Sequence, residues 1–244
     1  MRRLQGQVVY DEPFVASEEG PAATGHIHDF PFLLPAESRL DSWQYRYVKR
    51  ALDIVCALVM VVVFFIPGTL IALSILATSP YPVFYSEERI GRSGVPFRIW
   101  KFRSMRPHPM SHRAATNHAE GVVLQWRMDK SRHDPRVTMI GRFLRRWSLD
   151  EVPQLFNVLR GDMSLIGPRP IVKAETYYYK HLISFYLAAT PGLSGLWQVS
   201  GRSDLDFAER ARLDASYVQN WSLGADLRIF LRTIPAVLGR VGAR

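Results

Sequence analysis

The most pronounced pattern in this 244-residue sequence is an uninterrupted apolar stretch. No charged residue occurs in the 33 positions from Ile54 to Ser86, and the first part, Ile54–Ile66, is apolar on every face of a helix. A helix that is hydrophobic all round lies in lipid or deep in a core, and about 20 apolar residues suffice to cross a bilayer. We therefore expect a membrane segment. A buried helix of a soluble protein is the weaker alternative, because a chain this small rarely encloses so long an apolar run.

The charges that flank the apolar stretch indicate how it meets the membrane. Lys and Arg mark the cytoplasmic side of a membrane protein, and they occur on both flanks, for example at Lys49 and Arg50 before the stretch and at Arg89 and Arg92 after it. Pro67 removes a helix hydrogen bond and forces a kink or a break. The pattern favours a helix–break–helix that enters the bilayer and returns to the same face. A single crossing stays open as the alternative.

The remaining pattern predicts a mostly helical α+β domain. Short strands are expected at residues 83–85 and 95–102, around a turn at 91–94. Apolar positions at helical spacing, interleaved with Arg, predict amphipathic helices over 136–147 and 226–244. Helices of this kind lie in the membrane interface, although packing against a core is an equal alternative for either one taken alone.

These patterns divide the chain into three parts. Residues 1–45 are polar, rich in Pro and without a sustained period, so we expect a flexible tail. We expect residues 46–79 to form the re-entrant membrane segment and residues 80–244 to form a domain with interfacial helices at the cytoplasmic face. Residues 107–132 are polar and aperiodic and predict a loop or insertion within that domain.

Composition narrows the classes of partner. The formal net charge is +9 and the sequence pI is about 9.9, which favours phospholipid headgroups, nucleotides or nucleic acid as partners. Nucleic acid is the weakest of these, because no motif of that class is present. Cys56 is the single cysteine, so an intrachain disulfide is excluded.

The densest polar cluster runs from Arg145 to Arg169. In it, Ser148 has the character of a helix cap, and the carboxylates of Asp150 and Glu151 follow at once, where the positive end of a helix dipole favours the ionised form. First-turn acids that only start a helix are the plain interpretation. The surrounding arginines favour chemistry instead: a carboxylate can attack phosphorus, a second carboxylate can hold Mg²⁺, and Arg binds phosphate with two hydrogen bonds.

At these residues the chain resembles a known family, the monotopic polyprenol-phosphate phosphoglycosyl transferases, also called bacterial sugar transferases. The matching stretches occur in the family's order and cover roughly residues 46 to 240. They are Lys49–Asp53, Phe97–Met105, Asp134–Arg136, Ser148–Leu155, Gly161–Ser164, Gly167–Pro170 and Pro191–Arg202.

The resemblance implies a mechanism. Asp150 would attack the sugar-bearing phosphate of a UDP-sugar, leaving a covalent phosphosugar-aspartate and releasing UMP, and undecaprenyl phosphate would then take up the phosphosugar. Glu151 would ligate Mg²⁺. The implied substrate-binding residues are basic: Lys101, Arg103, Arg145, Arg169 and Arg202.

The resemblance also implies a place in the cell, the cytoplasmic face of the bacterial inner membrane, in contact with phospholipids. The chain looks like the short exopolysaccharide-type member that lacks an N-terminal transmembrane bundle. Members of the family often carry Ser before the break-point proline, where this chain has Ile66, so another group must satisfy the freed backbone. Galactose and glucose are the favoured sugars, homo-oligomerisation is open, and a non-catalytic membrane scaffold of a polysaccharide assembly complex is the alternative function.

Overall fold

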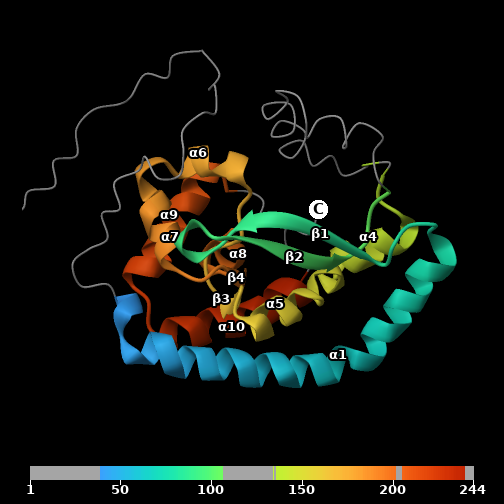
Figure 1. Cartoon of the computed structure of the whole chain (residues 1–244), viewed down its shortest axis with the longest axis horizontal. Coiled ribbons are helices and arrows are strands. Elements are labelled where there is room, and N and C mark those ends of the chain that lie inside the picture. Colours follow the sequence, from blue (N-terminus) through green and yellow to red (C-terminus); the bar gives the residue numbers. More distant parts are fainter. Residues whose placement is uncertain (1–38, 107–133, 135, 202–204, 240–244) are drawn as a thin grey trace, which may run out of the picture.

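The computed structural model describes residues 39–106, 134, 136–201 and 205–239 (Figure 1). The predicted tail before residue 39 and the predicted loop at 107–132 lie outside these ranges. The helices of the described part are α1 (Arg50–Thr78), α4 (Met139–Arg146), α5 (Gln154–Arg160), α6 (Thr176–Tyr179), α7 (Ile183–Ala188), α8 (Leu196–Ser200), α9 (Phe207–Gln219) and α10 (Leu223–Leu238). The strands are β1 (Phe84–Ile90), β2 (Pro96–Phe102), β3 (Ser164–Ile166) and β4 (Gly192–Ser194).

Shorter turns join these elements. A π-helical turn, η3 (Gln44–Lys49), leads directly into α1, and the 3-10 turns are η2 (Arg39–Asp41), η4 (Arg92–Gly94), η5 (Leu149–Glu151), η6 (Lys173–Glu175) and η7 (Lys180–Leu182). The described chain is therefore mostly helical with four short strands, which confirms the predicted α+β class.

Helix α1 is the apolar stretch that the sequence singles out. With η3 it forms one 35-residue helix that is long and apolar enough to cross a membrane, and only 6% of its most apolar window is buried. That low burial argues against a core helix of a soluble protein. The helix continues through Pro67, so the predicted interruption takes the form of a bend rather than a non-helical break (Figure 1). Just after it, the Thr69 hydroxyl donates to the Phe65 carbonyl oxygen at 2.8 Å, a contact of the kind that bends helices.

The polar first turn of α1 attaches the helix to the rest of the domain. Arg50 donates to the carbonyl oxygens of Val158 and Leu159 at 2.6 and 2.8 Å, and so binds the C-terminal end of α5. The buried Asp53 carboxylate accepts from the backbone N–H of Leu165 at 3.0 Å and from the hydroxyl of Ser164 at 2.8 Å. The apolar helix α1 is thus held to α5 and β3 by specific hydrogen bonds.

The four strands pair in two small sheets. β1 and β2 pair in antiparallel register from Phe84 opposite Phe102 to Ile90 opposite Pro96, as the sequence predicts, although β1 extends further than expected. β3 and β4 pair in parallel, and this sheet was not predicted. The backbones of Gly167 and Gly192 approach so closely there that a Cβ on Gly192 would lie 2.1 Å from the Gly167 nitrogen.

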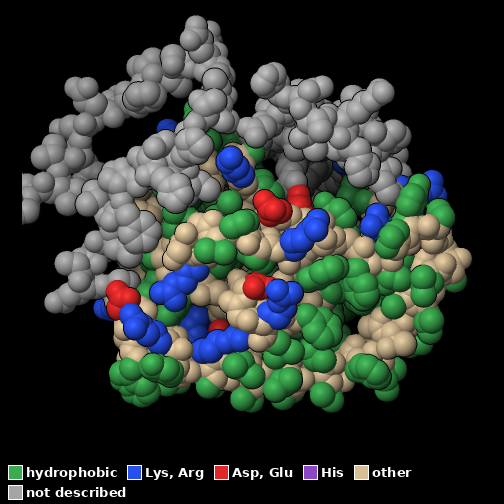
Figure 2. All heavy atoms as spheres, viewed as in Figure 1, with side chains coloured by type: hydrophobic (Ala, Val, Ile, Leu, Met, Phe, Trp, Pro, Cys, Tyr) green, Lys and Arg blue, Asp and Glu red, His purple; other side chains and the backbone are tan. Residues whose placement is uncertain are grey.

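The two predicted amphipathic helices are present as α4 and α10. Both leave large apolar side chains at the surface: Met139 and Phe143 of α4 are 78% and 55% exposed, and Leu227 and Leu231 of α10 are also exposed. This exposure favours the membrane-interface interpretation over core packing. Figure 2 shows hydrophobic side chains gathered along the lower and right-hand edges of the molecule, over α1 and the neighbouring α4.

Candidate active site

The Asp150–Glu151 pair lies on the tight turn η5, between α4 and α5. Ser148 enters this turn in the left-handed conformation, with φ of 54°, and its side chain makes no capping hydrogen bond. The prediction that Ser148 caps a helix is therefore wrong, because a cap needs an extended backbone and α5 begins only at Gln154. A non-glycine residue in this conformation costs about 1 kcal/mol or more, a cost often found at functional sites.

Lys101 of β2 faces the turn. Its Nζ lies 2.6 Å from Oε1 of Glu151, and the two side chains are 20% and 28% exposed. Asn157, which is fully buried in α5, fixes this arrangement: its Nδ2 donates to the Arg98 carbonyl oxygen at 2.8 Å, and its Oδ1 accepts from the Trp100 N–H at 3.2 Å. The sequence analysis missed Asn157, although an amide side chain within the apolar pattern of α5 was an available signal.

The electrostatics of Asp150 differ from the expectation for a helix start. Burial raises the pKa of the Asp150 carboxyl, and the negative charge of Glu151 raises it further. The positive charges of Lys101 and Arg145 lower that pKa but do not reverse the shift. The prediction that the position favours the ionised form is therefore wrong in this structure, because desolvation outweighs the attraction of the nearby cations.

Arg145 lies at the end of α4, one short turn before Asp150. Its guanidinium Nη1 lies 3.7 Å from the Met105 sulfur, and its charge acts on both Asp150 and Asp134. The side chain is half-buried. The structure thus places Arg145 near Asp150, and its implied role in substrate binding stays a prediction.

Arg169 lies on the loop between β3 and η6. The buried Arg89 anchors this loop, because its Nη1 donates to the Pro170 carbonyl oxygen at 3.0 Å. The Arg169 guanidinium lies over the Trp197 ring, with Cζ 5.6 Å from the ring centroid. Arg210 also lies over the Trp197 ring, with Cζ 4.8 Å from its centroid, and over the Phe207 ring at 5.0 Å. Arg169 is therefore positioned by both backbone anchoring and ring contact.

A buried polar cluster lies behind this loop. The Tyr179 hydroxyl donates to Oδ2 of Asp214 at 2.7 Å, and both residues are buried. Burial raises the pKa of Asp214 to about 7, and the hydrogen bond from Tyr179 and the charge of Arg169 partly offset that effect. Burial also raises the pKa of Tyr179 well above its ordinary value. The sequence analysis did not identify this pair, because neither residue lies near the motif cluster in the chain.

Side chains from five separate segments meet around a narrow cleft. Its lining comprises Arg89, Ile99, Lys101, Glu151, Gln154, Arg169, Pro170, Gly192, Leu193 and Gln198. Figure 2 shows acidic and basic side chains side by side on this face, above the hydrophobic edge. The cleft therefore combines a carboxylate with several cationic groups, an arrangement that suits a phosphate-containing ligand.

Of the predicted substrate-binding residues that the structure describes, Arg103 and Arg145 are not in this lining. Arg103 donates through Nε to the Pro82 carbonyl oxygen at 2.7 Å and through Nη2 to the Phe84 carbonyl oxygen at 3.2 Å, and its guanidinium lies over Tyr81 and Tyr85. These contacts hold the connection between α1 and β1. Arg202 lies outside the described residues.

The donor set at the turn fits the implied Mg²⁺. This ion is bound through one or two carboxylates, with phosphate oxygens and waters completing its shell. The carboxylates of Asp150 and Glu151 are adjacent, and their repulsion contributes to the raised pKa of Asp150, so a cation between them would be stabilising. Within the described ranges no cluster of three or more His, Cys, Asp or Glu side chains could hold an ion. Substrate and water would therefore supply the remaining ligands.

Comparison with known protein families identifies the wider group. The profile described as bacterial sugar transferase matches residues 44–240. The chain belongs to the bacterial sugar transferase family. The matched range includes α1, the Asp150–Glu151 turn, the Arg169 loop and α10. The match to the family therefore covers both the apolar helix and the cleft.

Several curated relatives share about two fifths of their residues with this chain. The undecaprenyl-phosphate galactose phosphotransferase of Salmonella typhimurium is 42% identical over 213 residues, which cover 86% of this chain and 44% of that relative. The exopolysaccharide production protein ExoY of Rhizobium meliloti is 42% identical over 211 residues, covering 85% of this chain and 92% of that relative. The UDP-glucose:undecaprenyl-phosphate glucose-1-phosphate transferase of Caulobacter vibrioides is 42% identical over 198 residues, covering 78% and 69%. The chain thus spans less than half the length of the Salmonella relative.

Proposed function

We propose that this bacterial sugar transferase moves a hexose 1-phosphate from a UDP-sugar to undecaprenyl phosphate and releases UMP. The observation that carries the proposal is the half-buried Asp150 on its turn, with the Lys101–Glu151 pair and Arg169 lining the adjoining cleft. The names of the Salmonella and Caulobacter relatives specify sugar phosphate transfer to the same lipid, which supports both substrate classes.

In the first step a carboxylate oxygen of Asp150 attacks the phosphorus that carries the sugar. A new oxygen–phosphorus bond forms, and the bond from that phosphorus to the UMP oxygen breaks, with its electron pair leaving on UMP. An acyl phosphate between Asp150 and the sugar remains. Lys101 and Arg145 oppose protonation of Asp150 and so favour the nucleophilic form, and Arg169 is suited to hold phosphate oxygens.

In the second step a phosphate oxygen of undecaprenyl phosphate attacks the same phosphorus. The bond from phosphorus to Asp150 breaks, its electron pair returns to the carboxylate, and the lipid diphosphosugar leaves. Bound Mg²⁺ would neutralise phosphate charge, and Glu151 is the residue that would hold it. Asp150 thus acts once as nucleophile and once as leaving group.

The membrane arrangement that supports this chemistry is monotopic. Arg50, at the start of α1, is hydrogen-bonded to α5, and Ile75, near its end, is buried with Phe102 and Leu144 of the same domain. A straight crossing of the hydrocarbon core, about 30 Å thick, would place these two ends on opposite sides. Because one folded unit contacts both ends of a bent helix, we infer a re-entrant α1, with α4 and α10 in the interface.

We infer that the cleft lies at the cytoplasmic face of the bacterial inner membrane, where nucleotide sugars are made available. The positive flanks of α1 support that side. Transfer of the first sugar phosphate to the lipid would begin assembly of an exopolysaccharide or glycoconjugate, in keeping with the name of the Rhizobium relative. UDP-galactose and UDP-glucose are the two donors to test first, since relatives carry both names.

The test is UMP release by protein in nanodiscs, given each UDP-sugar, undecaprenyl phosphate and Mg²⁺. We expect UMP from the wild type and from Asp41→Asn, which changes only an exposed ion pair with Arg46, and none from Asp150→Asn. Intact-protein mass spectrometry without the lipid should detect a hexose-phosphate adduct only where Asp150 is present. Background UMP from all three proteins across a panel of UDP-sugars would overturn the proposal and favour a non-catalytic membrane scaffold.

A further inference from the structure

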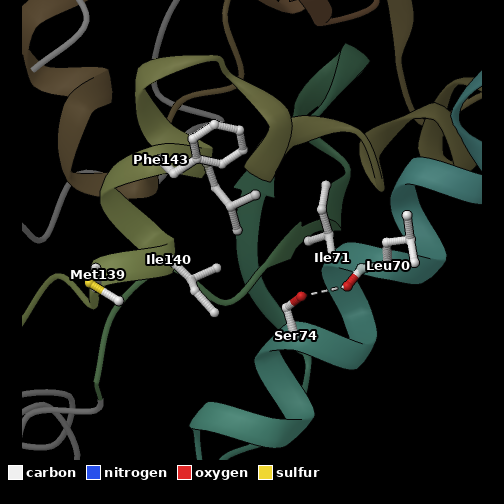
Figure 3. A pocket seen from close by; sticks show the side chains of 7 residues that line it. Leu70, Ile71, Ser74, Met139, Ile140 and Phe143 are labelled. Atoms are coloured by element: carbon white, nitrogen blue, oxygen red, sulfur yellow. Dashed lines mark hydrogen bonds between the residues drawn. The ribbon is translucent and has the colours of Figure 1, made fainter.

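An apolar groove lies between the C-terminal half of α1 and α4 (Figure 3). It has a volume of about 360 Å³ and is lined by Leu70, Ile71, Ser74, Met139, Ile140, Phe143 and Leu144. Ile71 and Ser74 of α1 lie across the gap from Ile140 of α4. The volume is near the lower end of the usual range for small-ligand sites, about 300–1,000 Å³, so the groove can take a segment of a long chain rather than a whole lipid.

The chemistry of the lining selects for hydrocarbon. Ser74 contributes the one polar side chain of the lining, and its hydroxyl already donates to the Leu70 carbonyl oxygen at 2.8 Å, as the dashed line in Figure 3 marks. A polar ligand would therefore lose its own hydrogen bonds to water and find little in return. An alkyl or prenyl chain makes no hydrogen bonds to water and therefore loses none when it enters the groove.

The floor of the groove continues into the packing beneath the active-site turn. Leu144 is completely buried and belongs to a cluster with Ile75 and Phe102. Leu149, the residue before Asp150, and Val152, the residue after Glu151, pack against the same cluster. The groove and the carboxylate turn are therefore two ends of one contiguous structure.

The positive charges of α4 lie at one end of the groove. Apolar Met139, Ile140 and Phe143 line the groove, whereas Arg145 and Arg146 occupy the last turn of the helix, next to the Asp150 turn. A ligand with a hydrocarbon chain and an anionic head matches this gradient only with the head toward Arg145. That orientation brings the head toward Asp150, whose pKa responds to the Arg145 charge.

We propose that this groove holds the head-proximal part of the prenyl chain of the lipid acceptor and directs its phosphate toward Asp150. The proposal rests on the proposed function and adds to it a site for the chain of the second substrate. A prenyl phosphate is favoured over a bilayer phospholipid because the acceptor phosphate must reach Asp150, and the groove ends at the residues that support that turn.

The experiment compares two substitutions on adjacent residues of α1. Ser74→Phe places a ring into the groove, and Leu73→Phe places the same ring on a neighbouring exposed position that does not line it. The first readout is kinetic: stoichiometric UMP release without lipid reports the first step, and the KM for undecaprenyl phosphate reports the second. We expect Ser74→Phe to leave the first step unchanged and to raise the acceptor KM about tenfold, equivalent to 1.4 kcal/mol, while Leu73→Phe matches the wild type.

The second readout is binding and does not depend on turnover. A photoreactive analogue of undecaprenyl phosphate should label α1 and α4 peptides in the wild type and in Leu73→Phe, and labelling should fall in Ser74→Phe. Excess undecaprenyl phosphate should compete, and excess phosphatidylethanolamine should not. Equal labelling of both variants, or equal competition by the phospholipid, would overturn the groove assignment. A wild type that is labelled but releases no UMP would overturn the proposed function and leave the groove assignment standing.

Discussion

Asp150 and Asp214 are two aspartates whose pKa values both lie above the ordinary value, and burial is the main cause for each. Their surroundings differ. Asp150 lies on a strained turn beside a cleft, with a carboxylate and two cations nearby. Asp214 is sealed inside the domain and accepts a hydrogen bond from the Tyr179 hydroxyl.

A raised pKa by itself therefore indicates that a carboxyl group is removed from water, not that it is catalytic. Position beside a cleft, next to a second carboxylate, distinguishes the proposed nucleophile from the enclosed acid. Asp214 contacts the site through Arg169, whose backbone hydrogen bond and charge act on it, so we regard Asp214 as a positioning residue. Four predictions, in order of decreasing effect, test this distinction.

Replacing each aspartate by asparagine should give the largest difference in activity between the two positions. Asp150→Asn removes the attacking oxygen, so we expect UMP release to fall by about 10³-fold or more. Asp214→Asn keeps an oxygen that accepts from Tyr179, and we expect UMP release within about tenfold of the wild type. Comparable losses in the two variants, with both folded by circular dichroism, would contradict the assigned roles.

The same two variants should separate in the pH dependence of stability. The pKa of Asp214 is about 7 in the fold against 3.8 for the ordinary group, so the folded state binds its proton more tightly than the unfolded state. The stabilisation is complete below about pH 4 and is lost as the pH rises to about 7, on the order of a few kcal/mol. Thermal unfolding should show this loss in the wild type and in Asp150→Asn, but a flatter profile in Asp214→Asn.

Changing the two neighbours of Asp150 should shift the acid limb of the pH–activity profile in opposite directions. Lys101→Met removes a charge that lowers the pKa of Asp150, so the acid limb should move to higher pH. Glu151→Gln removes a charge that raises that pKa, so the limb should move to lower pH. We expect shifts of about one unit, measured as single-turnover UMP release against pH. Shifts of the same sign would show that charge does not control the nucleophile.

Arg103 should give the smallest effect. Its hydrogen bonds to Pro82 and Phe84 hold the connection between α1 and β1, and it does not line the cleft. Arg103→Met should change the KM for the UDP-sugar less than about threefold and lower the free energy of unfolding by about 1 kcal/mol. The matched change Arg169→Met should instead raise that KM about tenfold. A larger kinetic effect at Arg103 would restore its predicted role in substrate binding.

The sequence identified the parts of this protein that depend on local pattern. The charge-free run of 33 residues indicated the apolar helix α1, and the apolar and aromatic residues at 95–102 indicated the strand β2. The motif that contains Asp150 and Glu151, together with Lys101 and Arg169, also identified the family. The detail of the turn, with a left-handed Ser148 and an α5 that starts only at Gln154, departs from what the residue preferences of this segment predict.

By itself, then, the sequence determined that a basic chain carries an apolar helix and a carboxylate motif, because composition and local periodicity require no folded context. Tertiary structure decided the rest. The parallel pairing of β3 with β4, the Asn157 contacts that align Lys101 with Glu151, and the Tyr179–Asp214 pair all join residues that are distant in the chain. Tertiary structure also decided the sign of the Asp150 shift: the cost of removing a carboxylate from water depends on the atoms packed around it, and those atoms come from segments that only folding brings together.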